Sequence, residues 1–187
     1  MDRKSGRRGR DTAVMAVTQQ LARIPEGYLA ACRQSAATSP DGDRHWDPPA
    51  CDVLDLDWAP ALLKRVGEVT GLEEAHLDAL RRATDGDTTL DLGFLDTPPH
   101  AIAPFGGAPT GLGVLQVAHV SKLLGQIDMP VLLAALPADE HDAASLIGQK
   151  GAVTGGLRPY LLEHFNALRD FYLDAAKRHL HMVLWWD

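Results

Sequence analysis

The clearest pattern of apolar and polar positions lies in residues 157–187. Apolar side chains recur there every three or four residues, a spacing that places them on one face of an α-helix. Pro159 suits the first turn of this helix, and Lys177 suits its last turn, where positive charge complements the helix dipole. Residues 180–186 then alternate with apolar side chains on both sides, which predicts a strand buried inside a sheet. The helical repeat consists of Leu157, Leu161, Phe165, Leu168, Tyr172 and Ala176.

Upstream, the same kind of pattern predicts shorter elements joined by polar connections. A strand that begins at Met15 is followed by a helix that opens at Pro25. Asp57 is a candidate N-cap for a helix that ends near Val69. Further helices are expected over residues 72–83 and 114–124, with an apolar turn from Pro130 to Leu136. Loops rich in Gly, Pro and Asp are expected over residues 38–53, 84–113 and 148–156, with a short strand near Leu90–Phe94.

These elements indicate an α+β fold, a mostly helical single domain with a small sheet that includes the N- and C-terminal strands. The chain has 187 residues, of which 45% are hydrophobic, and this is enough to bury a core. Its longest apolar runs fall short of a membrane span. We expect the domain to cover residues 15–187 and residues 1–14 to form a flexible basic tail, because residues 1–10 hold five Lys or Arg residues against one Asp.

The charge of the chain bears on its partners. The formal net charge is −7, and without the +4 of residues 1–10 the remainder carries −11. An acidic domain without an apolar signal segment argues against nucleic acid and membranes as partners, and we expect a cytoplasmic protein. Cys32 and Cys51 are isolated, which favours reduced thiols over a Cys32–Cys51 disulfide.

No catalytic arrangement stands out. The eight histidines show neither the His-Glu-x-x-His spacing nor a Cys/His cluster, so we expect no metal and no cofactor. Neither Ser121 nor Ser145 lies in a nucleophile elbow. The glycines of residues 148–156 lack the Gly-Lys-Ser/Thr ending of a phosphate loop. The sequence therefore favours a protein without enzymatic activity.

Aspartates concentrate in two irregular segments, residues 39–57 and 84–96. The first holds six aspartates against one arginine, and the second holds four with no Lys or Arg. If the fold brings both segments together, they would attract a basic partner, with nearby aromatic rings as the desolvated centre of the interface. The competing interpretation is that the aspartates cap turns and the tryptophans are buried. The candidate docking residues are Asp41, Asp43, Trp46, Asp52, Asp55, Asp57, Asp85, Asp87, Asp91, Phe94 and Phe105.

The order of segments resembles the YfbM-like family, a bacterial group of unknown function. The resemblance rests on residues 15–24 followed by a helix, on Leu54-Asp55-Leu56-Asp57-Trp58 opening another helix, and on the terminal Leu161-x-x-x-Phe165-x-x-Leu168-x-x-Phe171-Tyr172 helix with its closing strand. It covers most of residues 15–187, and the Pro-rich 97–109 region departs from it. The resemblance implies a compact bacterial α+β protein, brings no established catalytic residues, and is compatible with an immunity or inhibitor role.

The sequence thus predicts a non-enzymatic protein-binding module, of immunity or inhibitor type, that masks a basic surface of a partner protein. The alternative is an enzyme or small-ligand-binding protein with a pocket beside residues 84–113, in which Asp91, His100 or His164 converge. Both interpretations allow a monomer or a homodimer.

Overall fold

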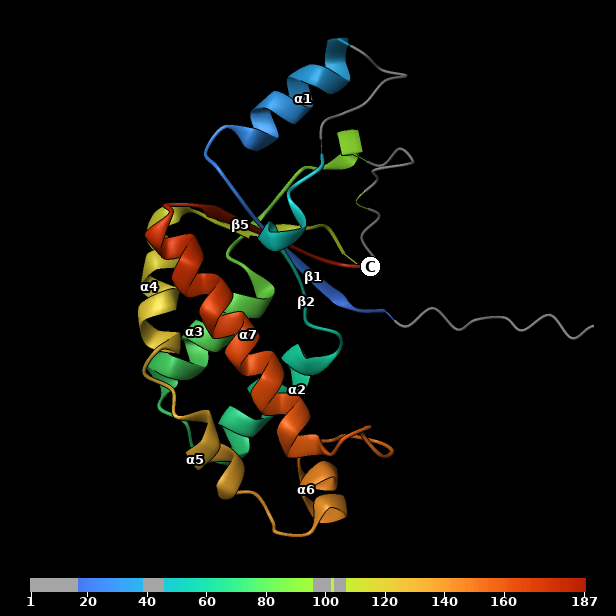
Figure 1. The fold of residues 1–187 in the computed structure, drawn as a ribbon, viewed down its shortest axis with the longest axis vertical. Helices are drawn as coiled ribbons and strands as arrows, with labels where there is room; N and C mark the ends of the chain where they lie inside the picture. The colour runs from blue at the N-terminus through green and yellow to red at the C-terminus, as the bar shows by residue number, and fades with distance from the viewer. Residues whose placement is uncertain (1–16, 39–45, 96–101, 103–106) are drawn as a thin grey trace, which may run out of the picture.

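The computed structural model describes residues 17–38, 46–95, 102 and 107–187, and it shows a sheet with helices on both of its faces (Figure 1). Within these residues the sheet has five antiparallel strands, in the order β2-β1-β5-β4-β3. The strands are β1 (Gln19–Ile24), β2 (Val53–Asp55), β3 (Thr88–Thr89), β4 (Thr110–Leu112) and β5 (His181–Trp186).

The central strand is β5, in which Leu184 pairs with Leu21 of β1 on one side and with Thr110 of β4 on the other. Met182, Val183, Leu184 and Trp185 are all buried, because both faces of this strand are covered. The predicted buried strand near the C-terminus, and the sheet shared with the N-terminal strand, are therefore confirmed.

The larger helical layer is built around α7 (Leu157–Lys177), the long helix that crosses Figure 1. Its apolar stripe is buried as the spacing predicts, and Leu161 and Leu168 are fully inaccessible. The Tyr172 hydroxyl donates a 3.0 Å hydrogen bond to the carbonyl of Ala83, and burial raises the pKa of this phenol. The helices α2 (Ala59–Val69), α3 (Glu74–Asp85) and α4 (Val114–Leu124) share this core, and α5 (Met129–Ala134) and α6 (Glu140–Leu146) connect α4 to α7 at the end remote from the sheet.

The opposite face of the sheet carries a smaller core under α1 (Tyr28–Thr38) and the 3-10 helix η2 (Gly93–Leu95). Trp46 is buried there, with its ring edge-on to Tyr28 at 5.7 Å and to Trp185 at 6.1 Å between ring centroids. Cys32 is also buried in this core whereas Cys51 is exposed, and no disulfide joins them.

Three local predictions are corrected by the structure, and one helix was missed. β1 begins at Gln19, and Met15 lies outside the described residues. Residues Leu90–Phe94 contain part of η2 instead of a strand, and the strands of this segment are β3 and β4, which were not predicted. The N-cap of α2 is Trp58, whereas Asp57 adopts a left-handed backbone conformation with φ 51°. The helix α6 was not predicted, although its N-cap carboxylate, on Asp139, accepts hydrogen bonds from two backbone N–H groups.

Candidate functional site

Three of the predicted docking residues, Asp41, Asp43 and Phe105, lie outside the described residues, as does His100. Trp46 is 7% exposed and belongs to the smaller core. The ring that was expected to anchor an interface thus has most of its apolar surface buried against Tyr28 and Trp185.

Asp52 is 6% exposed and lies at the centre of a partly buried ion-pair network. Arg178 donates two hydrogen bonds to its carboxylate, at 2.6 and 2.9 Å, and Arg23 donates a third at 2.6 Å. Asp174 completes the network by pairing with both arginines. The hydrogen bonds from Arg178, followed by those from Arg23, lower the pKa of Asp52 to about 2, although burial opposes them. Asp52 therefore fastens the 3-10 helix η1 (Ala50–Asp52) to β1 and to the end of α7, and it is not available to a partner.

Asp85 and Asp87 are also neutralised within the chain. Lys64 pairs with Asp85 at 2.6 Å, and the Arg82 Nε donates to Asp87 at 2.8 Å. The hydrogen bond from Arg82 lowers the pKa of Asp87. Since these are partly exposed pairs, they contribute little to stability, yet they cancel the charge that a basic partner would meet.

Asp91 and Phe94 lie close to α1. The Asp91 side chain accepts from the backbone N–H of Gly93 at 3.4 Å, which is the turn-capping role of the competing interpretation. Arg33 donates to the Asp91 carbonyl at 3.0 Å and lies over the Phe94 ring, 5.1 Å from its centroid. These contacts attach η2 to α1.

Asp55 and Asp57, by contrast, lie beside a stack of aromatic rings, and we call Asp55, Asp57, Trp58, Tyr160 and His164 the Tyr160 cluster. The Trp58 and Tyr160 rings stack with centroids 4.6 Å apart and planes inclined by 22°, and the His164 ring follows at 4.2 Å. All three rings are partly exposed. Because Tyr160 and His164 are four residues apart, they occupy the same face of α7.

Hydrogen bonds fix the two carboxylates of the Tyr160 cluster. The Tyr160 hydroxyl donates to Asp57 Oδ2 at 3.0 Å, and the backbone N–H of Asp57 donates to Asp55 Oδ1 at 2.7 Å. Burial and the neighbouring Asp57 carboxylate raise the pKa of Tyr160, so the phenol stays a hydrogen-bond donor. Asp57 holds a left-handed conformation that costs energy for a residue other than glycine, and such strain often marks a functional position.

Among the described residues, Asp55 and Asp87, one from each acidic segment, lie at opposite edges of the sheet. Asp55 ends β2 at one edge of the sheet, and Asp87 directly precedes β3 at the other edge. Four inter-strand spacings, roughly 19 Å, separate those edges. Within the described residues, Asp55 and Asp57 form no ion pair with Lys or Arg, unlike Asp52, Asp85 and Asp87.

The sequence did not identify Tyr160 and His164 as part of this site. Tyr160 borders the apolar stripe predicted for this helix, and His164 was considered only for a pocket. Only one weak indication of the site is present in the sequence, namely two ring-bearing residues that are spaced by four near the start of α7. Its proximity to the Asp55–Trp58 segment depends on contacts between residues about 100 positions apart.

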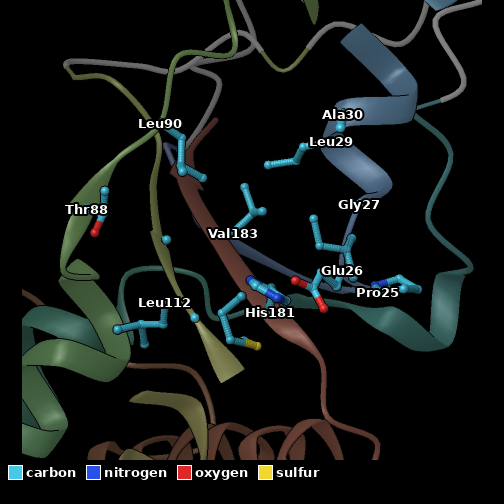
Figure 2. Close-up of a pocket in the computed structure, with 14 residues that line it drawn as sticks. Pro25, Glu26, Gly27, Leu29, Ala30, Thr88, Leu90, Leu112, His181 and Val183 are labelled. Carbon is cyan, nitrogen blue, oxygen red and sulfur yellow. The ribbon is translucent and has the colours of Figure 1, made fainter. Parts of the chain in front are cut away.

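A pocket of about 340 Å³ lies between the start of α1 and the strands β1, β4 and β5 (Figure 2). It is beside residues 84–113, as the alternative interpretation requires, and Thr88 and Leu90 contribute to its wall. The residues named by that interpretation do not converge there, because Asp91 lines a different hollow and His164 belongs to the Tyr160 cluster.

The described part of the chain contains no group of three or more His, Cys, Asp or Glu side chains arranged to hold a metal ion. His179 precedes β5 in a left-handed turn with φ 54°, and His181 is the first residue of the strand. No helix among the described residues is long and apolar enough to cross a membrane.

Comparisons with known proteins show the fold. No protein-family model matches the chain, and no curated protein sequence matches it significantly. Among solved structures, the chain is similar to YfbM from Escherichia coli, a protein of unknown function, with a TM-score of 0.53 and 14% sequence identity. The match covers 91% of this chain and 99% of that chain, so the predicted YfbM-like α+β fold is confirmed.

Proposed function

We propose that this protein with a YfbM-like fold is a non-enzymatic docking module that binds a basic segment of a partner protein, in the manner of an inhibitor or immunity protein. The supporting observation is the Tyr160 cluster. Its two carboxylates form no ion pair within the described residues, and they flank rings that are stacked and partly exposed.

The geometry of the Tyr160 cluster suits a cationic side chain. The hydrogen bonds to Asp55 and Asp57 orient both carboxylates before a partner arrives, which reduces the ordering cost of binding. The face of Trp58 that does not stack on Tyr160 attracts a guanidinium or ammonium group through its π electrons. Arginine fits best, because its planar group both stacks on rings and bridges two carboxylate oxygens.

The remaining charge of the molecule supports the approach of such a partner. The net charge of −7 attracts a basic protein over a distance of about one Debye length, which raises the association rate more than the affinity. The proposed docking surface does not include Trp46, Asp52, Asp85 or Asp87, because each of these side chains is buried or ion-paired within the chain.

The proposal is tested by calorimetry and size-exclusion chromatography with the purified product of the neighbouring gene. The wild-type chain is expected to bind at micromolar concentration or tighter and to protect cells from that product. The double variant Asp55→Asn/Asp57→Asn is expected to weaken binding by about tenfold or more, since it removes two charge-assisted contacts. A Trp58→Ala variant tests the ring contribution, because aromatic anchors dominate interface energies.

The matched control is Glu163→Gln/Asp170→Asn, which removes the same charge from exposed positions of α7. If both double variants weaken binding equally, only the overall charge matters and the Tyr160 cluster is not the docking surface. Absence of binding at micromolar concentration, together with absence of protection in cells, would reject the proposed function.

A further inference from the structure

The pocket beside α1 has the composition of a small-ligand site. Its wall is mostly aliphatic, with Leu29, Leu90 and Val183 directed toward the space in Figure 2. Its volume of about 340 Å³ lies at the lower end of the range of about 300–1,000 Å³ that ligand pockets occupy. An apolar wall of this size accommodates a short aliphatic chain.

The polar groups of the pocket gather at one end. In Figure 2 the carboxylate of Glu26 and the ring of His181 lie next to each other, below the aliphatic side chains. The sheet register explains this placement, because His181 pairs with Ile24 in β1, two residues before Glu26. Gly27, with φ 83°, then turns the chain from β1 into α1, and this turn holds Glu26 beside the strand end.

The pocket also depends on a glycine in β4. A Cβ at Gly111 would lie 2.9 Å from Leu90 Cδ1 and 2.9 Å from the Met182 carbonyl oxygen. Glycine therefore lets the Leu90 side chain lie against the strand, where it forms part of the pocket wall.

From these contacts we propose that the pocket binds a small aliphatic amine, with the alkyl chain against the aliphatic wall and the ammonium group at Glu26 and His181. The charged side chains of the pocket determine the class of ligand. Glu26 is the acidic residue among those that line the pocket, and no Lys or Arg lines it. A carboxylic acid of the same length would meet a like charge, whereas an ammonium group gains a charge-assisted hydrogen bond.

This site is independent of the proposed docking function. None of the residues of the Tyr160 cluster lines the pocket, and the smaller core and the larger core are separated by the sheet. A chain that does not bind the amine could still bind the partner protein, and a chain that does not bind the partner could still bind the amine.

The test is a titration of the ¹⁵N-labelled full chain with hexylamine, hexanol and hexanoate, followed by amide chemical shifts. Hexylamine is expected to shift the amides of Glu26 to Ala30, Thr88 and Gly111 in a saturable manner, and to bind about tenfold more tightly than hexanol. Hexanoate is expected not to bind. Equal binding of hexylamine and hexanol, tighter binding of hexanoate, or shifts confined to other regions would each overturn the proposal.

Two variants locate the interaction. Glu26→Gln is expected to remove the preference for hexylamine over hexanol. Ala30→Phe, at an exposed position of α1, is expected to fill the pocket and abolish the amide shifts caused by hexylamine and by hexanol. Glu163→Gln, an exposed change outside the pocket, is the matched control and is expected to bind hexylamine as the wild type does. Unchanged hexylamine binding by Ala30→Phe would reject this pocket as the site.

Discussion

Substitution of Asp52 by Asn tests whether the ion-pair network around this carboxylate stabilises the fold. The pKa of Asp52 falls from 3.8 to about 2 on folding, because Arg178 and Arg23 donate to its carboxylate. Each pKa unit corresponds to about 1.4 kcal/mol, so the charged form contributes about 2–3 kcal/mol to the free energy of unfolding at neutral pH. Asn keeps the shape but not the charge, and it leaves the nearly buried Arg23 without this partner. We expect Asp52→Asn to lose about 2–3 kcal/mol at pH 7.

The pH dependence of this loss is the more specific test. Because the folded-state pKa is the lower one, the contribution is complete above the unfolded pKa of about 4 and disappears as the pH falls through about 2. The difference in unfolding free energy between wild type and Asp52→Asn should therefore shrink to roughly half at pH 3. Urea unfolding followed by circular dichroism at pH 7, 5, 4 and 3 measures it.

A matched control is Asp170→Asn, whose carboxylate is 63% exposed and pairs with the adjacent Arg169. This control should change the free energy of unfolding by about 0.5 kcal/mol or less. The reasoning is refuted if Asp52→Asn costs no more than the control at pH 7, or if its cost is the same at pH 3 as at pH 7.

Three further substitutions give expected losses in the free energy of unfolding, measured by urea or thermal denaturation. Gly111→Ala should cost about 1–3 kcal/mol because its Cβ would meet Leu90 and the Met182 carbonyl, whereas Gly107→Ala, with open space around it, should cost far less. Leu168→Ala should cost about 2–5 kcal/mol because this side chain is fully buried, and Leu115→Ala, 82% exposed, should be nearly neutral. Tyr160→Phe should cost about 1–2 kcal/mol through the lost hydrogen bond to Asp57, and a double-mutant cycle with Asp57→Asn should then show coupling; additivity would contradict that bond.

The elements that the sequence predicted well are those with long periodic patterns. α7 keeps its apolar spacing of three and four over 21 residues, and β5 has six residues whose two faces are both apolar, so the sequence predicts both without tertiary information. β3 and β4 have two and three residues, too few to show a period, and they exist because β5 supplies the pairing partner for β4.

The candidate site was less predictable, because local composition does not reveal distant partners. Asp52 was assigned to a docking surface, yet its partners Arg23 and Arg178 lie 29 and 126 positions away in the sequence. Asp57 was assigned to a helix cap, but its carboxylate bonds to Tyr160, 103 positions away. A cluster of aspartates in a loop therefore predicts charge, whereas the fold decides which of those charges remain available.

The central position of β5 has a consequence for biosynthesis. β1 and β4 both pair with β5, which is translated about 160 residues after β1; at about 5–20 residues per second this delay lasts on the order of 10–30 s. Until β5 is made, the edges of β1 and β4 that face it are unpaired, and unpaired strand edges can join those of other chains. The nascent polypeptide is therefore expected to need a holding chaperone, and slowed translation before residue 181 should increase aggregation.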